Sequence, residues 1–418
     1  MTFLPLHAHI LPPAPPSTKI RLALLATALA DALGGPAEFH ARFSFDFISE
    51  MLPNETFRLP KGVWTDDTSG ALALGRAIAA GSRAGAAAAG GGESGKEDAA
   101  QLDAYYRWWQ DGVLSATGQC FDIGNTTQRA LSIYRQALRR QAAAVALPRI
   151  AHDLRGAVFG GNGSLMRVLP VGLAYWGAEP SVVGKKARRS SAVTHPNEVC
   201  REACEVWARG VAQVVRAAAG VKEMTKLDVL HHFAAFPYET GVLRKALAAE
   251  VPLPAAAAHD SQAMETHYAA HHPILRLVSQ TVVGGSSASD LETSDSQTSL
   301  ETRILALLPM DATLPSSGYV VHTIVAALYA FLVTSSFEDG ASLTANMGDD
   351  ADTVGAVYGG LAGVWYAVDG HEGDATQDPS AGGFWSPRVR RWRDDLVCRD
   401  VIEEVAGEVV GFARQWEA

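Results

Sequence analysis

The chain has 418 residues, 48% hydrophobic and 19% charged, which is enough to bury a large core. Its formal net charge of −10 argues against a nucleic-acid-binding surface, so we expect no nucleic-acid partner. Four cysteines without a C-x-x-C pair, no secretory signal and no unbroken apolar run of membrane-spanning length indicate an intracellular protein, cytoplasmic by default, with no membrane partner.

Apolar residues recur with helical spacing along most of the chain, whereas alternating β-branched strands are scarce. This pattern predicts an all-α fold with helices packed in layers around one core. In chain order, the predicted helices are Ile20–Ala32, Ser69–Ala80, Asp98–Gln110, Thr127–Val145, Asn197–Ala219, Tyr319–Thr334, Thr353–Ala367 and Val401–Trp416.

Three stretches depart from the helical pattern. Residues 1–17 are rich in proline and are expected to form a disordered tail. Residues 81–95 (Ala, Gly and Ser) and 284–302 (Ser, Asp and Thr) offer little apolar surface, which predicts flexible surface insertions. We expect residues 18–418 to form a single domain, because two chemically similar segments lie near its two ends and would share one site.

These similar segments are acidic: Thr65-Asp66-Asp67-Thr68 and Asp350-Ala351-Asp352-Thr353. One such segment alone is more often a helix N-cap, whose side chain accepts a hydrogen bond from a free N–H group. The second segment, however, offers more carboxylates than a cap needs. Crowded carboxylates repel one another, and hard oxygen ligands suit Mg²⁺, Mn²⁺ or Ca²⁺ rather than zinc. If the fold joins the two segments, we expect a binuclear metal site.

The predicted helix after the second acidic segment is unusually rich in glycine. Glycine lowers helix propensity, so a helix that keeps several glycines is expected to need close packing against another backbone. The residues are Gly355, Gly359, Gly360 and Gly363.

Two glycine-containing loops each precede a helical pattern. Residues 160–167 read Gly-Gly-Asn-Gly-Ser-Leu-Met-Arg, and residues 122–127 read Asp-Ile-Gly-Asn-Thr-Thr. Such loops can present N–H groups to an anion, although most are simple turns or caps. Arg167 favours an anion or an acidic neighbour. His195, in a Thr-His-Pro turn, is either structural or a donor to a phosphate.

The first predicted helix ends in the stop signal Gly34-Gly35-Pro36, and Glu38 lies just beyond it. Glu38 is therefore on a loop. It is either a solvated surface acid or a mobile carboxylate over a cleft.

Six motifs, in this order, resemble the ADP-ribosylglycohydrolase family, which includes dinitrogenase-reductase-activating glycohydrolase and the ADP-ribosyl-arginine and ADP-ribosyl-serine hydrolases. They run from about Leu22 to Ala367. The resemblance implies a compact all-α fold with two Mg²⁺ ions, replaceable by Mn²⁺, at the base of a cleft, and a monomer by default. The motifs are ADALGGPAEF, WTDDT, DIGNTT, GNGSLMR, THP and NMGDDADT.

The resemblance also implies roles for individual residues. Glu38 matches a glutamate that lies on a movable loop near the metals in some members, and it is a candidate catalytic residue together with Asp66 and Asp350. The implied metal ligands are Thr65, Asp66, Asp67, Asp350, Asp352 and Thr353. The implied ADP-ribose-binding residues are Gly124, Asn125, Gly161, Asn162, Gly163, Ser164 and His195.

One departure from the family pattern is the second acidic segment, which usually reads Gly-Gly-Asp but here reads Gly348-Asp349-Asp350. The extra carboxylate of Asp349 either alters metal affinity or faces solvent.

The activity implied is Mg²⁺-dependent hydrolysis of the C1″ glycosidic bond that links ADP-ribose to an arginine or serine side chain or to a small acceptor. Two alternatives stay open: a non-catalytic ADP-ribose-binding protein, and a metal-dependent phosphohydrolase that cuts a nucleotide diphosphate. The complete set of oxygen ligands disfavours the first, and the motif order disfavours the second. The linkage that is cut stays open, as does nuclear or mitochondrial targeting.

Overall fold

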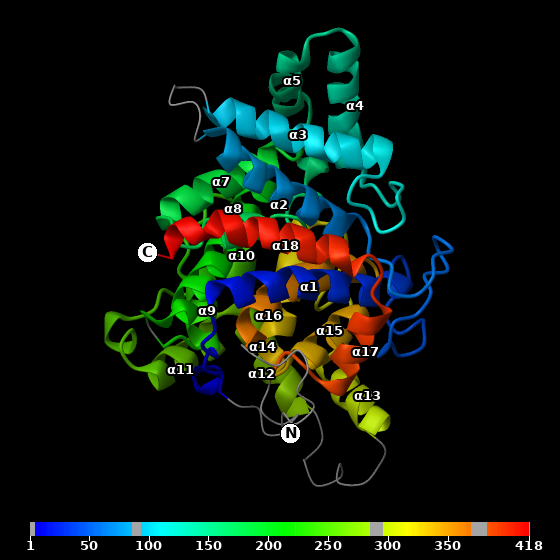
Figure 1. The fold of residues 1–418 in the computed structure, drawn as a ribbon. Coiled ribbons are helices and arrows are strands. Elements are labelled where there is room, and N and C mark those ends of the chain that lie inside the picture. Colours follow the sequence, from blue (N-terminus) through cyan, green and yellow to red (C-terminus); the bar gives the residue numbers. More distant parts are fainter. Residues whose placement is uncertain (1–4, 86–92, 222, 285–295, 369–382, 418) are drawn as a thin grey trace.

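The computed structural model describes residues 5–85, 93–221, 223–284, 296–368 and 383–417. These residues form a helical domain without strands, in which three isolated bridges are the only β-type pairings (Figure 1). The prediction of an all-α fold is therefore confirmed.

The first half of the domain contains α1 (Pro16–Gly34), α2 (Asp66–Gly85), α3 (Glu93–Asp111), α4 (Asn125–Arg139), α5 (Ala146–Asp153), α6 (Leu169–Ala174), α7 (Pro180–Ala192) and α8 (Glu198–Arg216). The second half contains α9 (Lys226–Ala234), α10 (Gly241–Leu247), α11 (Ser261–His271), α12 (Pro273–Gly284), α13 (Ser296–Leu307), α14 (Val320–Val333), α15 (Phe337–Ala345), α16 (Ala351–Tyr366), α17 (Pro387–Asp395) and α18 (Arg399–Ala413).

Helices α1 and α16 form the centre of the domain and pack against each other more extensively than any other described pair. Helix α18 packs on α1 and α2, and α14 packs on α16, while α3, α4 and α5 lie together at one end of the molecule (Figure 1). All sixteen residues of α16 are buried. Residues from the N-terminal and C-terminal regions thus share one core.

The predicted glycine-rich side of α16 faces α1. A Cβ atom on Gly355, Gly359 or Gly363 would lie 2.6, 2.4 or 2.7 Å from the nearest backbone atom of α1. These atoms belong to Ala30, Ala26 and Ala23 respectively. Distances this short leave no room for a methyl group, so the two backbones are in direct contact.

Several predicted boundaries differ from the structure. Helix α4 ends at Arg139 rather than Val145, because the chain turns at Gln141, whose φ is 53°. The centres of the two expected insertions, residues 86–92 and 285–295, lie outside the described residues. Helices occupy part of both expected ranges. In the first, α2 continues to Gly85 and α3 begins at Glu93; in the second, α12 continues to Gly284 and α13 begins at Ser296.

The proline-rich segment, expected to be a disordered tail, packs against the domain from residue 5 onward. Leu6 and Leu11 are buried, and the N–H of Leu11 donates to the carbonyl of Met224 at 2.8 Å. The buried Lys19 Nζ donates to the carbonyl of Pro12 at 2.9 Å. Apolar residues between the prolines supply burial, and the extended chain offers free backbone groups for these bonds.

Residues Pro16–Ala37 form the one described helical stretch that passes a length and composition test for a membrane span, with a mean hydropathy of 1.3. The sequence-based expectation of no such stretch was based on the charges that interrupt it, including Lys19 and Asp31. Within the apolar window, 83% of the residues are buried inside the domain, as in a core helix.

Replacing Gly359 with alanine tests the contact between α1 and α16. The added methyl group would lie 2.4 Å from the carbonyl oxygen of Ala26, so the helices must separate. We expect Gly359→Ala to lower the free energy of unfolding by about 1–3 kcal/mol in a urea titration. The matched control is Gly411→Ala in α18, where a Cβ meets no atom within 4 Å and alanine should instead stabilise the helix by up to about 1 kcal/mol. Equal effects of the two substitutions would contradict this account.

Candidate metal centre

The first acidic segment begins α2, but the residue that caps this helix comes from α1. The Asp31 carboxylate accepts hydrogen bonds from the backbone N–H groups of Thr65, at 3.0 Å, and Thr68, at 3.1 Å. The Thr65 and Thr68 hydroxyls donate to the same carboxylate. Because Asp31 accepts from two N–H groups at the start of α2, it takes the capping role that Asp66 or Asp67 could have filled.

The Thr65 hydroxyl lies against carboxylates from three helices. Its Oγ1 is 2.9 Å from an oxygen of Asp31, 3.1 Å from one of Asp67 and 3.3 Å from one of Asp352. A hydroxyl carries one proton and can donate to one of these oxygens at a time. The other close oxygen contacts therefore require bound protons or a cation.

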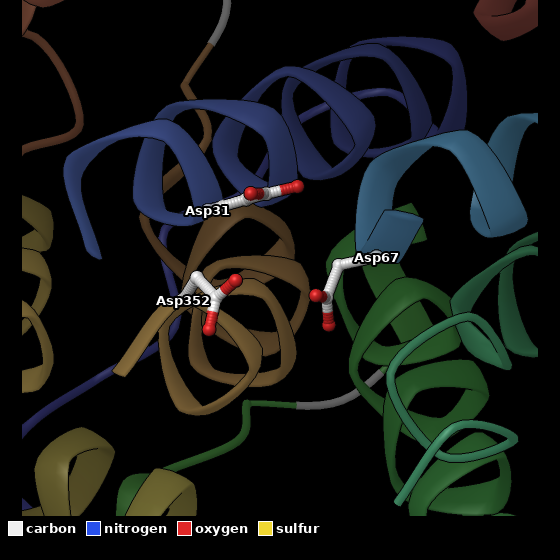
Figure 2. A group of neighbouring side chains, drawn as sticks. All are labelled: Asp31, Asp67 and Asp352. Carbon is white, nitrogen blue, oxygen red and sulfur yellow. The ribbon is translucent and has the colours of Figure 1, made fainter. Parts of the chain in front are cut away.

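Two groups of acidic residues have oxygens within 4.8 Å of one another. Asp31, Asp67 and Asp352 form the first group and are all buried (Figure 2). Glu38, Asp350 and Asp352 form the second group. Asp352 belongs to both, so it lies between two places where several carboxylates meet.

The ends of α16 and α2 also meet here. The Thr353 hydroxyl donates to Asp67 Oδ2 at 3.2 Å, which links the second acidic segment to the first. Two buried carboxylate oxygens in the described part of the chain have no hydrogen-bond partner: Asp67 Oδ1 and Glu38 Oε2. Unpartnered buried carboxylate oxygens fit the hard-oxygen ligands of a divalent cation. The buried aspartate clusters are thus consistent with metal binding.

Burial and mutual repulsion raise the pKa of the carboxyl groups in this centre. Burial is the main cause for Glu38, and the neighbouring aspartates add to it, Asp352 most strongly. The pKa values of Asp31 and Asp122 rise to about 6, again chiefly through burial. Asp66, Asp67, Asp350 and Asp352 are shifted upward from the same cause. The folded chain thus brings together more negative charge than it neutralises itself.

Asp66, an expected metal ligand, belongs to this electrostatic cluster but to neither of the two close groups. It is buried, and the charges of Asp122, Asp31 and Asp350 add to the effect of burial on its pKa, whereas Arg167 opposes it. Arg167 itself is buried, with its guanidinium 4.1 Å from the centroid of the Tyr105 ring. The expectation of an acidic neighbour for Arg167 therefore agrees with the structure.

The Glu38 loop is attached to the second acidic loop. The N–H of Phe39 donates to the carbonyl of Asp349 at 2.6 Å, and the N–H of Asp349 donates to the carbonyl of His40 at 2.8 Å. The buried Arg42 guanidinium donates to the carbonyls of Met347 and of residues 309 and 314. These bonds hold Glu38, which is itself buried, beside the acidic centre. The solvated-surface interpretation of Glu38 was therefore wrong.

The extra carboxylate of Asp349 is exposed, which decides between the two alternatives left open for it. Gly348 and Asp349 both adopt left-handed backbone, with φ of 68° and 57°. Glycine is the usual residue in this conformation, and aspartate is among the few others that tolerate it. The family's Gly-Gly at this position therefore has a backbone reason, and Asp349 fits it without joining the carboxylate groups.

The glycine-rich loop borders the acidic centre through Asn162. Its side-chain amide donates to Asp350 Oδ2 at 2.5 Å and to the Thr323 hydroxyl at 2.9 Å. Its backbone N–H donates to Gly318, so this N–H is not available to an anion in this structure. Gly161 pairs with Tyr319 in an isolated bridge. Asn162 therefore positions an aspartate of the centre.

Gly163, Ser164 and His195 pack together beneath this loop. A Cβ on Gly163 would lie 3.0 Å from the His195 ring, and the buried Ser164 Oγ accepts a hydrogen bond from Ser191 at 2.9 Å. Burial, assisted by Arg167, lowers the pKa of His195 well below its usual value, so the ring is neutral. His195 therefore offers no positive charge to a phosphate.

Gly124 and Asn125, the remaining expected ADP-ribose-binding residues, are exposed at the start of α4. Further along α4 lies a groove of about 370 Å³ against α5 and the segment before the glycine-rich loop. The lining residues are Gln128, Arg129, Ser132, Ile133, Gln136, Asp153, Leu154 and Phe159.

Two carboxylates of the centre were not identified as site residues from the sequence: Asp31 and Asp122. Asp31 could have been noticed as a single acid within an otherwise apolar helix, since such a buried charge requires partners. Asp122 was part of a recognised motif, but its proximity to Glu38, whose pKa it helps to raise, depends on the tertiary fold.

Comparisons with known proteins show the family of the chain. The ADP-ribosylglycohydrolase family profile matches residues 12–417. The chain is 27% identical over 379 residues to ADP-ribosylarginine hydrolase Tri1 of Pseudomonas putida (strain GB-1), covering 90% of this chain and 77% of that protein. It is also 27% identical to Tri1 of Serratia proteamaculans (strain 568), covering 97% and 82%.

A third relative is ADP-ribosyl-[dinitrogen reductase] glycohydrolase of Rhodospirillum rubrum, 24% identical, with 83% of this chain and 85% of that protein covered. A solved ADP-ribosylglycohydrolase-related protein complex superposes with a TM-score of 0.56 at 26% identity, covering 95% of this chain and 99% of that chain. The chain therefore belongs to the ADP-ribosylglycohydrolase family and is a hydrolase of that family.

Metal binding can be tested apart from activity. We expect Mg²⁺ or Mn²⁺ to raise the melting temperature above its value in EDTA, because cations offset the repulsion among the buried carboxylates. Asp352→Asn should abolish most of this rise, since Asp352 belongs to both carboxylate groups. Asp349→Asn is the control and should keep the rise, because its carboxylate is exposed. If Asp352→Asn responds to cations as the unsubstituted protein does, the centre has been misplaced.

Proposed function

We propose that the protein is a Mg²⁺-dependent hydrolase that releases ADP-ribose from arginine side chains by cleaving the C1″ glycosidic bond. The observation that carries the proposal is the single Thr65 hydroxyl among oxygens of Asp31, Asp67 and Asp352, next to a second carboxylate group that shares Asp352. Family membership and the names of two relatives, ADP-ribosylarginine hydrolases, support the reaction and the acceptor.

The two carboxylate groups would hold one cation each, with Asp352 between them. Mg²⁺, or Mn²⁺ in its place, fits because every side-chain donor is a hard oxygen. When bound, such ions bind hydroxyls of the ribose and lower the pKa of a water molecule. The residues proposed to hold them are Thr65, Asp66, Asp67, Asp350, Asp352 and Thr353, as expected from the resemblance, with Asp31 added by the geometry.

The protein's own groups would orient the sugar and move the proton. Water attacks C1″ as the bond to the acceptor nitrogen breaks, and the bonding electron pair leaves with the guanidine group. Positive charge develops on the ribose, and the neighbouring carboxylates stabilise it. Glu38 is the candidate to accept the water proton and pass it to the leaving nitrogen, because its buried Oε2 lacks a hydrogen-bond partner within the described chain.

The ADP part of the substrate would extend away from the carboxylates along α4. The groove beside the glycine-rich loop offers an aromatic ring, Phe159, and a guanidinium, Arg129, which lie 5.4 Å apart. An aromatic ring suits a nucleobase, and a positive charge suits a diphosphate. Gly124 and Asn125 lie at the N-terminus of α4, between this groove and Asp122.

A substrate panel tests the reaction. We expect release of free ADP-ribose from an ADP-ribosylated arginine peptide, dependent on Mg²⁺ and lost with EDTA, whereas serine-linked and O-acetyl substrates should react more slowly. Asp66→Asn should lower kcat by at least about 100-fold, because it removes charge from the centre. AMP as the product would instead indicate the phosphohydrolase, and tight ADP-ribose binding without release would indicate the non-catalytic binder.

Glu38→Gln tests the proton acceptor. Glutamine keeps the size of the side chain but cannot take the water proton, so we expect kcat to fall by about 100- to 10,000-fold. The dissociation constant of ADP-ribose, measured by calorimetry, should stay within a few-fold. An unchanged kcat would remove Glu38 from the mechanism while leaving the metal centre intact.

A further inference from the structure

We propose that three phenylalanines beside the acidic centre form a binding surface for the guanidinium group of the modified arginine and so determine acceptor specificity. We call Phe39, Phe57 and Phe121 the aromatic rim. The inference rests on the proposed hydrolase function and adds to it the residues that would distinguish an arginine linkage from a neutral one.

The rim is a continuous row of rings. The ring centroids of Phe39 and Phe57 are 6.2 Å apart in an edge-on arrangement, and those of Phe57 and Phe121 are 5.6 Å apart. Phe39 is 63% exposed, although a ring of this size usually contributes to a core. Phe57 and Phe121 are half-buried. The row therefore presents aromatic surface to solvent that the fold itself does not use.

Both ends of the row join the acidic centre through the backbone. Phe39 directly follows Glu38, and Phe121 directly precedes Asp122. The carboxyl groups of Glu38 and Asp122 are close enough for each to influence the pKa of the other. A group bound to the ribose C1″ atom at the carboxylates would therefore leave the centre beside these rings.

The backbone of Phe39 is costly to maintain. Its φ is 63°, a left-handed conformation that is an outlier for a bulky residue. Two hydrogen bonds to the second acidic loop fix this conformation, one donated by Phe39 and one accepted by His40. Backbone of this kind is retained where the surrounding structure requires the side chain in one place.

The charge around the aromatic rim favours a cationic ligand. The face of an aromatic ring is electron-rich, and guanidinium groups stack on it. The adjoining carboxylates of Glu38 and Asp122 can pair with the same cation. A nucleobase attached to a diphosphate is disfavoured here, because the phosphates would meet these acids. The groove along α4, with Arg129 and Phe159, suits that end of the substrate instead.

Phe39→Leu tests the rim and has a matched control in the same segment. Phe43 is also exposed, at 51%, and left-handed, with φ of 64°, but it lies outside the row of rings. For an arginine-linked ADP-ribosyl peptide, we expect Phe39→Leu to raise KM by about 3- to 10-fold with kcat little changed. Phe43→Leu should leave KM unaltered, and Phe39→Trp should keep it low. Thermal melting confirms that each variant is folded.

Two further measurements separate the rim from the reaction. Calorimetry in the Glu38→Gln background compares an arginine-linked peptide with free ADP-ribose, so binding is measured without turnover. Phe39→Leu should weaken binding of the peptide and leave binding of ADP-ribose unchanged. Fluorinated phenylalanines at position 39, which withdraw electrons from the ring face, should weaken the peptide in proportion to fluorine content.

The outcomes distinguish the two proposals. Equal effects of Phe39→Leu and Phe43→Leu on the affinity for the peptide would contradict the proposed role of the aromatic rim. The proposed hydrolase function would be unaffected. Weaker binding of free ADP-ribose by Phe39→Leu would also contradict this role, because the aromatic rim would then contact the nucleotide. If no ADP-ribosyl substrate is cleaved but binding of the peptide still depends on Phe39, the proposed hydrolase function is wrong and the proposed role of the aromatic rim is supported.

Discussion

Helices α1 and α16 touch backbone to backbone, because glycines of α16 lie against alanines of α1 where no methyl group would fit. The contact continues to the start of α16, where a Cβ on Gly34 would lie 2.6 Å from the carbonyl oxygen of Ala351 and 2.7 Å from the Cα of Asp352. This approach brings Asp31 from one helix and Asp352 from the other within reach of a common partner. The chemistry of the centre therefore depends on helix packing as much as on the acids.

The centre also depends on where helices begin. Helices α2 and α16 both start at the carboxylates, so the positive ends of two helix dipoles point into the cluster. Arg167 adds a full charge near Asp66. These groups offset only part of the negative charge, because the pKa values of the carboxyl groups remain raised. Bound cations would offset the remaining repulsion, and the buried unpartnered oxygen Asp67 Oδ1 would face one of them.

The sequence was sufficient to predict the features that depend on residues close together in the chain. Helical spacing predicted the all-α fold, and the glycines of α16 predicted a close neighbour. The acidic segments could be recognised because several ligands lie within four residues. Asp31 could not be recognised in this way, since its partners Thr65 and Thr68 are 34 and 37 residues away. The packing of Leu6 and Leu11 was missed because prolines dominate the local pattern, although the leucines between them can still be buried against the domain.

The carboxylates and hydroxyls of this centre come from residues far apart in the sequence, from position 31 to position 353. During synthesis, the emerging polypeptide carries Asp31 and Asp67 for most of its length without Asp352 or Thr353 to complete the cage. The complete carboxylate cluster therefore exists only after α16 has been synthesised and has docked on α1. A chain that stopped before α16 would lack Asp352 and Thr353, and with Asp352 the carboxylate that the two groups share.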